Sequence, residues 1–321
     1  MTEAQYDSPS RVDYLRLSVT DRCNLRCTYC MPPQGVESFS HGQILSYEEL
    51  AAFARVAVEL GISKVRLTGG EPLVRRGIVD LVASLAAMPS ISDLSLTTNG
   101  LLLPRFAAAL RAAGLHRVNI SIDSLRPARY ARITRGGRLA DALAGIEAAF
   151  AAGFFPVKLN VVLQQGIEEE LDDFAALSRE RELHVRFIEY MPLDRRHVTG
   201  DGFVPAAPVL ERLRAAHGLE PAERPYGHGP ADYWRVIGAR GTLGFIAGVS
   251  EHFCGSCNRL RLTADGRLKT CLFSGEETDV RPLLGHPERL KAALREALQA
   301  KTYDRRAERV PNRRGMSQIG G

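Results

Sequence analysis

Residues 15–30, LRLSVTDRCNLRCTYC, place an apolar run that predicts a β-strand directly before a loop with three cysteines. The run covers residues 15–20, and the cysteines are Cys23, Cys27 and Cys30. Clustered thiols of this kind indicate a structural bridge, a metal ion or a metal cluster. The choice among these three decides how the rest of the chain is interpreted.

Disulfide bonds are the least favoured of the three interpretations. The chain opens MTEAQYDS, without a basic start followed by an apolar run, and therefore predicts no secretory signal. It also has no apolar stretch long enough to span a membrane. We therefore expect a cytoplasmic protein, in which thiols stay reduced and clustered cysteines indicate metal binding or catalysis.

Zinc and an iron–sulfur cluster are the two remaining interpretations. Structural zinc takes four tetrahedral ligands, so three local thiols would need a distant fourth ligand. A [4Fe–4S] cluster takes one thiolate per iron. Three cysteines would hold three irons and leave the fourth iron open to an exogenous ligand, and an open iron makes chemistry possible.

The spacing Cys-x3-Cys-x2-Cys resembles the cluster motif of the radical S-adenosylmethionine (SAM) superfamily. The resemblance implies a [4Fe–4S] cluster at Cys23, Cys27 and Cys30, whose open iron binds the amino and carboxyl groups of SAM. It further implies that one electron from the cluster cleaves SAM to methionine and a 5′-deoxyadenosyl radical. Tyr29 corresponds to the aromatic residue that members of this superfamily place against the adenine of SAM.

Composition agrees with a globular enzyme. The chain has 321 residues, of which 45% are hydrophobic and 25% charged, enough for a sizeable core in one or two domains. The net charge is +5 and the pI about 9.0, but acidic residues are interspersed among the basic ones. We therefore expect no nucleic-acid partner from charge alone.

Strand-like and helix-like segments alternate along the first two thirds of the chain. The predicted strands are 15–20, 64–68, 92–97, 117–122, 155–162 and 184–190, and the predicted helices are 46–60, 76–88, 104–113, 139–152 and 168–181. Ser46 and Glu49 predict a capping box at the first helix. Crossover helices imply parallel strands, and eight such strands would close a barrel. Six predict an α/β fold with a partial, open TIM-type (β/α)6 barrel, as radical SAM enzymes generally have.

Polar residues follow several of these strands, at the end where barrels of this type carry their chemistry. The sequence TGGEP at 68–72 resembles the motif that binds the SAM amino group, which assigns Gly70 and Glu71 to SAM. By the same resemblance Ser121 and Met191 contact SAM. The residues that the resemblance assigns to the substrate are Arg66, Thr97 and Lys158.

A second cysteine triad lies in the last third of the chain. The stretch TGDGFVPAAP at 199–208 predicts a linker, and we expect a barrel domain over 1–195 and a second region over 196–321. That region contains Cys254, Cys257 and Cys271 in the spacing Cys-x2-Cys-x13-Cys. The residues alone leave zinc, completed by His252, and an iron–sulfur cluster about equally favoured.

The two triads together resemble the GTP 3′,8-cyclase family of molybdenum cofactor biosynthesis, over nearly the whole chain. The resemblance implies a second [4Fe–4S] cluster, whose open iron meets the guanine of GTP. It implies a lyase that converts GTP to (8S)-3′,8-cyclo-7,8-dihydro-GTP: the deoxyadenosyl radical removes the C3′ hydrogen of the ribose, and C3′ attacks C8 of guanine. An external one-electron donor and a cyclic pyranopterin synthase that consumes the product are the implied partners. A homodimer is compatible with it, and a membrane partner is not expected.

Arginines beside the second triad suit a triphosphate. Arg259 and Arg261 are two apart on an apparent strand, so their side chains share one face, and Arg16 lies in the first strand. Arginine forks bind phosphate in pairs of hydrogen bonds, and no P-loop motif is present. The resemblance also includes the ending Gly320-Gly321, which we expect to enter the catalytic site. Another radical SAM enzyme with an auxiliary cluster, such as a peptide-modifying one, is the main alternative, and a zinc-binding or nucleic-acid-binding module is a distant one.

Overall fold

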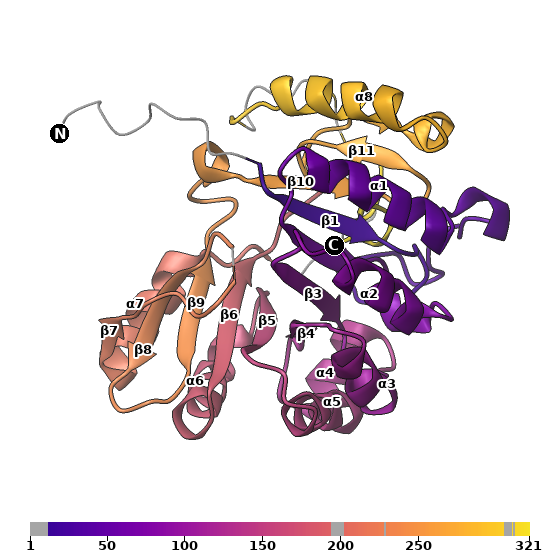
Figure 1. Ribbon diagram of the computed structural model, residues 1–321. Helices are drawn as coiled ribbons and strands as arrows, with labels where there is room; N and C mark the ends of the chain where they lie inside the picture. Colours follow the sequence, from indigo (N-terminus) through magenta and orange to yellow (C-terminus); the bar gives the residue numbers. More distant parts are fainter. Residues whose placement is uncertain (1–11, 194–201, 228, 305–309, 311) are drawn as a thin grey trace. The chain divides into compact units, whose positions relative to one another are not determined.

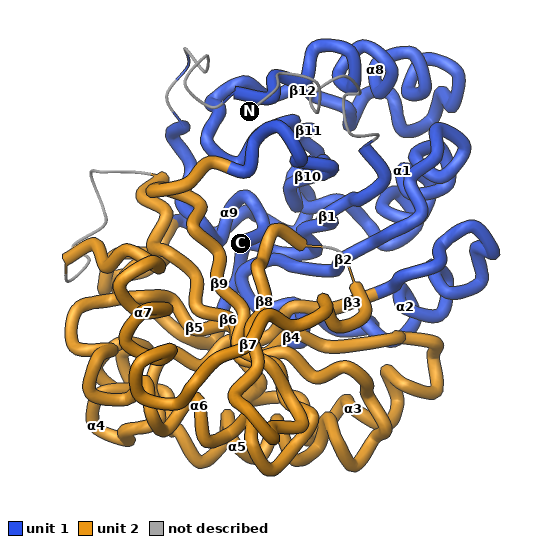
Figure 2. The backbone as a smooth tube through the Cα atoms, turned by 90° about the vertical axis from the view of Figure 1, so that its left-hand side faces the viewer, with its two compact units in different colours: residues 1–23, 37–94, 253–321 blue, residues 24–36, 95–252 orange. Residues whose placement is uncertain are grey.

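The computed structural model describes residues 12–193, 202–227, 229–304, 310 and 312–321. The chain forms two compact units that alternate along the sequence (Figure 2). Unit 1 comprises residues 1–23, 37–94 and 253–321, and unit 2 comprises residues 24–36 and 95–252. The first strand and the described residues from 253 onward therefore fold into the same unit.

Unit 1 contains strands in the order β12-β11-β10-β1-β2. Their bounds are β1 Tyr14–Ser18, β2 Lys64–Thr68, β10 Arg259–Leu262, β11 Arg267–Lys269 and β12 Thr278–Asp279. Strand β1 pairs in parallel with β2 on one side and with β10 on the other, whereas β11 and β12 are antiparallel additions. Strand β3 (Asp93–Thr98) begins in unit 1 and ends in unit 2.

Helices of unit 1 pack their apolar faces inward. They are α1 Tyr47–Glu59, α2 Ile78–Ala86, α8 Pro287–Gln299 and the single turn α9 Met316–Ile319, with short 3₁₀ turns at His41–Gln43, Pro72–Val74, Cys254–Ser256 and Arg281–Leu283. The predicted capping box is confirmed: the Glu49 amide donates to Ser46 Oγ and the Ser46 amide donates to the Glu49 carboxylate. Helix α8 runs beside α1 (Figure 1), where Lys291 pairs with Glu59 at 2.6 Å.

Unit 2 orders its strands β3-β4-β5-β6-β9-β8-β7. The bounds are β4 Arg117–Ser121, β5 Val157–Leu163, β6 Leu183–Glu189, β7 Leu219–Pro221, β8 Asp232–Val236 and β9 Thr242–Ile246. Its helices are α3 Leu103–Ala112, α4 Pro127–Thr134, α5 Leu139–Ala151, α6 Leu171–Glu180 and α7 Ala206–His217, with a 3₁₀ turn at Ile167–Glu169. Strands β3 to β6 and β9 pair in parallel, and β8 and β7 are antiparallel.

The six predicted strands are confirmed as β1 to β6, with ends that differ from the prediction by at most two residues. The pair β1–β2 and the pairs from β3 to β6 are parallel, as predicted. Within each unit the sheet has different strands at its two edges and does not close. The α/β class with an open barrel is therefore confirmed. Two further parallel strands, β10 and β9, extend the arrangement beyond the prediction.

The predicted linker at 199–208 is partly wrong. Residues 199–201 and the predicted domain boundary at 195 lie outside the described residues, so the two-domain division stays a prediction. Pro205 has an extended backbone and directly precedes α7, which begins at Ala206, whose amide donates to Glu189 Oε1 at 3.0 Å. Proline fits the start of a helix because the first amides have no partner inside it. The Gly- and Pro-rich composition of residues 199–208 therefore predicted a linker where helix α7 begins.

In the part of the chain that the structure describes, every helix is too short or too polar to pass through a membrane.

Candidate active site

The first cysteine triad follows β1. Cys23 is the last residue of this part of unit 1, whereas Cys27 and Cys30 belong to unit 2. Among the described residues none of the three forms a disulfide bond, and all three are of intermediate exposure. The Cys30 amide donates to the Cys27 carbonyl at 2.9 Å and so forms a tight turn that presents both thiols. By their chemistry, three partly exposed thiols suit a [4Fe–4S] cluster with one open iron.

Helix α4 holds this turn within unit 2. The amides of Arg26 and Thr28 donate to the carbonyls of Thr134 and Ile133 at 3.1 and 2.9 Å. Arg135, at the end of α4, donates from Nη1 to the carbonyls of Arg26 and Met31 at 3.1 and 2.7 Å. Contacts on both sides of the Cys27–Cys30 turn therefore fix its backbone.

The adjacent glycines after β2 approach the loop before Cys23 very closely. The Gly70 amide donates to the Thr20 carbonyl at 2.7 Å, and the Glu71 amide donates to the Arg22 carbonyl at 2.8 Å. A Cβ at Gly70 would lie 2.3 Å from the Arg22 carbonyl oxygen, so no other residue fits. This packing requires Gly70 whether or not it contacts SAM, and the SAM roles of Gly70 and Glu71 stay predictions.

Tyr29 is positioned by a carboxylate that the sequence analysis did not assign to the site. Its hydroxyl donates to Asp123 Oδ2 at 2.7 Å, and the Val162 amide donates to Asp123 Oδ1 at 2.8 Å. Burial raises the pKa of Asp123 to about 6, against these two hydrogen bonds. Asp123 follows Ser121 by two residues at the end of β4, so strand alternation was a usable signal for it.

Strands of unit 2 carry a polar face in strict register. One row across them contains Thr97, Asn119, Lys158, His184 and Thr242, and the next contains Ser121, Asn160, Arg186 and Gly244. Thr97, Ser121 and Lys158, predicted from sequence, therefore share this face. Met191 lies two residues beyond β6 and is partly exposed.

Arg186 is a further cation of this face, and it was not predicted from the sequence. Its Nη2 donates to Asn119 Oδ1 at 2.9 Å and to Asn160 Oδ1 at 2.5 Å. Gly244 makes room for it, because a Cβ there would lie 3.1 Å from Arg186 Cγ. Lys158 Nζ donates to the Tyr226 carbonyl at 2.8 Å. The two rows thus present two cations and no carboxylate.

Three arginines stand side by side in unit 1. Arg16 of β1 is in register with Arg66 of β2 and with Arg261 of β10. Burial lowers the pKa of Arg16, and Arg261 and Arg66 lower it further because like charges repel. Burial and Arg259 lower the pKa of Arg261 to about 10. An anion bound here would relieve this repulsion, so the row is suited to a phosphate group.

The tail reaches this row. Arg16 donates from Nε and Nη2 to the Gly320 carbonyl at 3.4 and 3.3 Å, and Arg261 donates from Nη1 to the same oxygen at 3.3 Å. A Cβ at Gly320 would lie 2.6 Å from Thr68 Oγ1. The backbone of Gly320 therefore occupies a place that only glycine fits.

The second triad lies in the same unit. The Cys257 amide donates to the Cys254 carbonyl at 3.0 Å, and Cys271 follows β11. Burial alone would raise the pKa of Cys257, but Arg259 and Lys301 outweigh it and lower the pKa. Lys301 Nζ lies 3.5 Å from Cys257 Sγ, a contact for which the sequence held no signal. A thiol biased toward the thiolate fits a metal ligand.

Comparisons with known proteins agree with this geometry. Residues 17–177 match the family model of the Radical SAM superfamily, and residues 183–308 match that of Molybdenum Cofactor Synthesis C. The chain is 52% identical to a GTP 3′,8-cyclase from Geobacter sulfurreducens, over 96% of this chain and 92% of that one. It is 52% identical to another from Pelotomaculum thermopropionicum, over 97% and 98% of the two chains.

The fold has a distant solved counterpart. The crystal structure of Streptococcus suis SuiB bound to S-adenosylmethionine superposes with a TM-score of 0.63 at 13% identity, over 89% of this chain and 68% of that one. At this identity the likeness concerns the fold alone.

Proposed function

Because the chain belongs to the GTP 3′,8-cyclase family of the radical SAM superfamily, we propose that it converts GTP to (8S)-3′,8-cyclo-7,8-dihydro-GTP, the first step of molybdenum cofactor biosynthesis. The observation that carries the proposal is the arginine row Arg16, Arg66 and Arg261, in the same unit as the second cysteine triad. An anion site beside a candidate metal centre fits a substrate that carries both a triphosphate and a base.

The arginine row is assigned to the triphosphate. The three arginines share one register position on neighbouring strands, and the guanidiniums of Arg16 and Arg261 both donate to the Gly320 carbonyl, so these positive charges are held in place before GTP arrives. Preorganised donors lose little entropy on binding, and guanidinium forks match phosphate oxygens. Three further residues remain predicted GTP contacts: Arg259, Thr97 and Lys158. The guanidinium of Arg259 lies 4.9 Å from the ring centre of Phe253. Arg186 is a further candidate for a GTP contact, because it is positively charged and lies on the same face of the sheet as Lys158.

The first triad is assigned to the SAM cluster. When reduced, a cluster at Cys23, Cys27 and Cys30 would supply the electron that cleaves SAM to methionine and the 5′-deoxyadenosyl radical. Asp123 holds the Tyr29 hydroxyl and so fixes the ring that we assign to the adenine. Ser121, Met191, Gly70 and Glu71 remain predicted SAM contacts.

The second triad is assigned to a second [4Fe–4S] cluster. Lys301 and Arg259 favour the thiolate of Cys257, which is the form that binds iron. The external electron donor, the cyclic pyranopterin synthase that takes the product, the cytoplasmic location and a homodimer also belong to this proposal. Zinc at this triad is the competing interpretation, and iron and zinc content of anaerobically purified protein separates the two.

Anaerobic incubation with GTP, SAM and a reductant tests the function. We expect 5′-deoxyadenosine and cyclised GTP in equal amounts, identified by mass spectrometry after quenching. Omission of GTP should prevent cyclised product without altering the iron content. Release of 5′-deoxyadenosine that GTP neither stimulates nor converts into product would favour a different radical SAM substrate, such as a peptide.

A further inference from the structure

Gly320 is held in place more tightly than is usual for a residue of a terminal segment. Terminal residues usually fray unless something ties them down. Here one carbonyl oxygen accepts hydrogen bonds from two guanidiniums, and a φ of +76° at Gly320 turns the chain into a place without room for a Cβ. Helix α9 contributes only four residues, too few to be stable alone.

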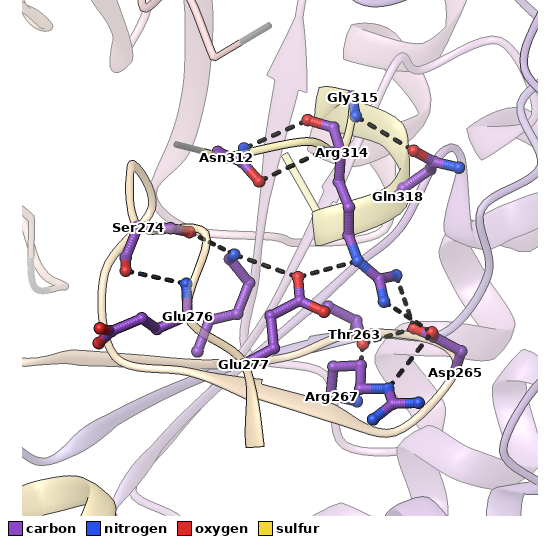
Figure 3. A network of polar contacts seen from close by, with 11 residues as sticks. Thr263, Asp265, Arg267, Ser274, Glu276, Glu277, Asn312, Arg314, Gly315 and Gln318 are labelled. Atoms are coloured by element: carbon purple, nitrogen blue, oxygen red, sulfur yellow. Dashed lines mark hydrogen bonds and ion pairs between the residues drawn. The ribbon is translucent and has the colours of Figure 1, made fainter. Parts of the chain in front are cut away.

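Arg314 ties this segment to the rest of unit 1. Its Nη1 and Nη2 donate to the two carboxylate oxygens of Asp265 at 3.0 and 2.9 Å, and its Nε pairs with Glu277 at 2.8 Å. Figure 3 shows the guanidinium of Arg314 pointing from the tail toward Asp265, with Glu277 on its other side. All three side chains are about four-fifths buried, with relative exposures of 20%, 14% and 17%. Such a bidentate, partly buried pair is much stronger than an exposed ion pair.

Both acceptors are themselves held in place. Thr263 Oγ1 donates to Asp265 Oδ1 at 2.6 Å, and the buried Lys269 Nζ pairs with Glu277 at 3.2 Å. Burial would raise the pKa of Asp265, but hydrogen bonds from Arg314 and Thr263 outweigh it and keep the pKa below its usual range. Asp265 is thus ionised at neutral pH.

The anchor point and the target of the tail are on one hairpin. Asp265 lies in the turn between β10 and β11, four residues after Arg261, which contacts Gly320. A hydrogen-bonded hairpin is rigid, so it fixes the distance between the two points. Between them the tail is kept in place by the buried side chains of Ser317 and Ile319.

We propose that Arg314, Asp265 and Glu277 form a positioning anchor, called here the tail anchor, that holds the Gly320 carbonyl against Arg16 and Arg261. The part of this inference that concerns catalysis rests on the proposed function. The ion pairs of the tail anchor join Arg314 of the tail to Asp265 and Glu277, so it acts through the tail. Its loss releases Gly320 without removing a substrate contact.

Arg314→Ala tests the tail anchor in the intact, anaerobically prepared holoenzyme. We expect amide exchange in residues 316–321, followed by mass spectrometry, to become as fast as in an unstructured segment. We also expect kcat for cyclised GTP to fall by as much as about 100-fold, as for a misplaced catalytic group. KM for GTP and the iron content should stay near the wild-type values. Arg314→Lys keeps the charge but loses the fork, and should lie between the two.

Arg267→Ala is the matched control. Arg267 belongs to the same hairpin, and its ion pairs are with Asp279 at 2.9 Å and with Asp265 at 4.0 Å, neither of which is a residue of the tail. It should change kcat by less than about twofold. Adding Arg314→Ala to Asp265→Ala should have a smaller effect than Arg314→Ala alone, because the two substitutions share the Arg314–Asp265 contact and only the pair with Glu277 is left to lose.

Two results would overturn the tail anchor: tail exchange in Arg314→Ala as slow as in the wild type, or equal losses of kcat in Arg314→Ala and Arg267→Ala. Failure of the proposed function gives a different result. The wild-type enzyme would then form no cyclised GTP, while the exchange measurement would still report whether Arg314 holds the tail.

Discussion

Arg16 has a like-charged neighbour on either side, Arg66 and Arg261. Such an unfavourable arrangement is retained in a folded protein when the charges serve to bind an anion. Burial, followed by the like charges of Arg261 and Arg66, disfavours the charged form of Arg16 and lowers its pKa. Part of this effect is offset by the Gly320 carbonyl, a neutral acceptor with a negative end. A triphosphate would offset more, because each phosphate oxygen carries charge. Binding of a triphosphate would thus relieve the repulsion among the three arginines, and this relief would add to the affinity for the substrate.

Arg261→Ala should weaken GTP binding by about 1–3 kcal/mol, the value of a charge-assisted hydrogen bond. Arg259→Ala should fall in the same range if Arg259 also contacts phosphate. Calorimetric titration of GTP into the anaerobic enzyme measures both. Arg55→Ala is the control, since Arg55 is an exposed arginine of α1 in the same unit. Equal affinities in all variants would assign the arginines to structure instead of substrate.

Cysteine substitutions should separate the two triads. Cys27→Ser should abolish release of 5′-deoxyadenosine, because it removes a ligand of the proposed SAM cluster. Cys257→Ser should leave much of that release but stop cyclised GTP from forming. Both should lower iron per chain by up to one cluster, measured after anaerobic purification. Normal cyclisation by Cys257→Ser would refute a catalytic second cluster.

His184 predicts a pH dependence of stability. Burial, followed by Lys158, Arg186 and Arg235, lowers its pKa to about 4. The unfolded chain binds this proton near pH 6.5 and the folded chain does not, so stability is lost as pH falls through that window. At pH 5 the loss is about 2 kcal/mol, from about 1.4 kcal/mol per pH unit.

Denaturant unfolding at pH 7.5 and 5 measures this effect as a difference between the wild type and His184→Gln. Many groups titrate in this range, but only the wild type includes the term from His184. The variant should therefore lose about 2 kcal/mol less than the wild type over the same interval. An identical loss in the two proteins would show that His184 is protonated in the folded state.

At the scale of elements, α4 is the support of the first triad. Arg135 at its end holds two carbonyls that flank the Cys27–Cys30 turn. Arg135→Ala should therefore loosen the turn, and the visible absorbance of the cluster should decay several-fold faster in the presence of an iron chelator. Arg132→Ala, an exposed change on the same helix, should decay as the wild type does. Equal decay in both variants would mean that the thiols alone determine cluster retention.

The sequence predicts where strands and helices lie along the chain better than it predicts which strands pair with one another. Apolar runs separated by amphipathic stretches located β1 to β6, because periodicity is a local property. The row of Arg16, Arg66 and Arg261 could not be read in the same way, since it requires β1 to pair with a strand more than 240 residues away. Strand β7 was missed because it has only three residues, and helix α7 was missed because its start overlaps the stretch interpreted as a linker. Strand β8 was also missed. Arg186 was within reach, since it alternates with His184 on a predicted strand.

At the scale of the molecule, function depends on distant parts of the chain folding into one unit. Unit 1 brings together Arg16 from the start of the chain, Arg66 from β2, Arg261 from β10 and Gly320 from the tail. None of these residues is informative alone in a chain rich in arginine and glycine. Together they place the Gly320 carbonyl among several cations. Because Gly320 belongs to the tail and not to a strand, the tail can be truncated while the strands that carry the arginines remain.

Removal of Gly320 and Gly321 should therefore leave folding, iron content and GTP affinity nearly intact but severely reduce cyclisation. Gly320→Ala should act similarly, because its φ is +76° and its Cβ would lie 2.6 Å from Thr68 Oγ1 and 2.9 Å from Ser18 Cβ. Gly285→Ala is the control, since no atom lies within 4 Å of a Cβ there. Yields of cyclised GTP and 5′-deoxyadenosine are measured for each, with and without a peptide of residues 312–321. Partial rescue by the peptide is expected if the tail acts by position, whereas full activity after truncation would show that the contact with Arg16 and Arg261 has no role in catalysis.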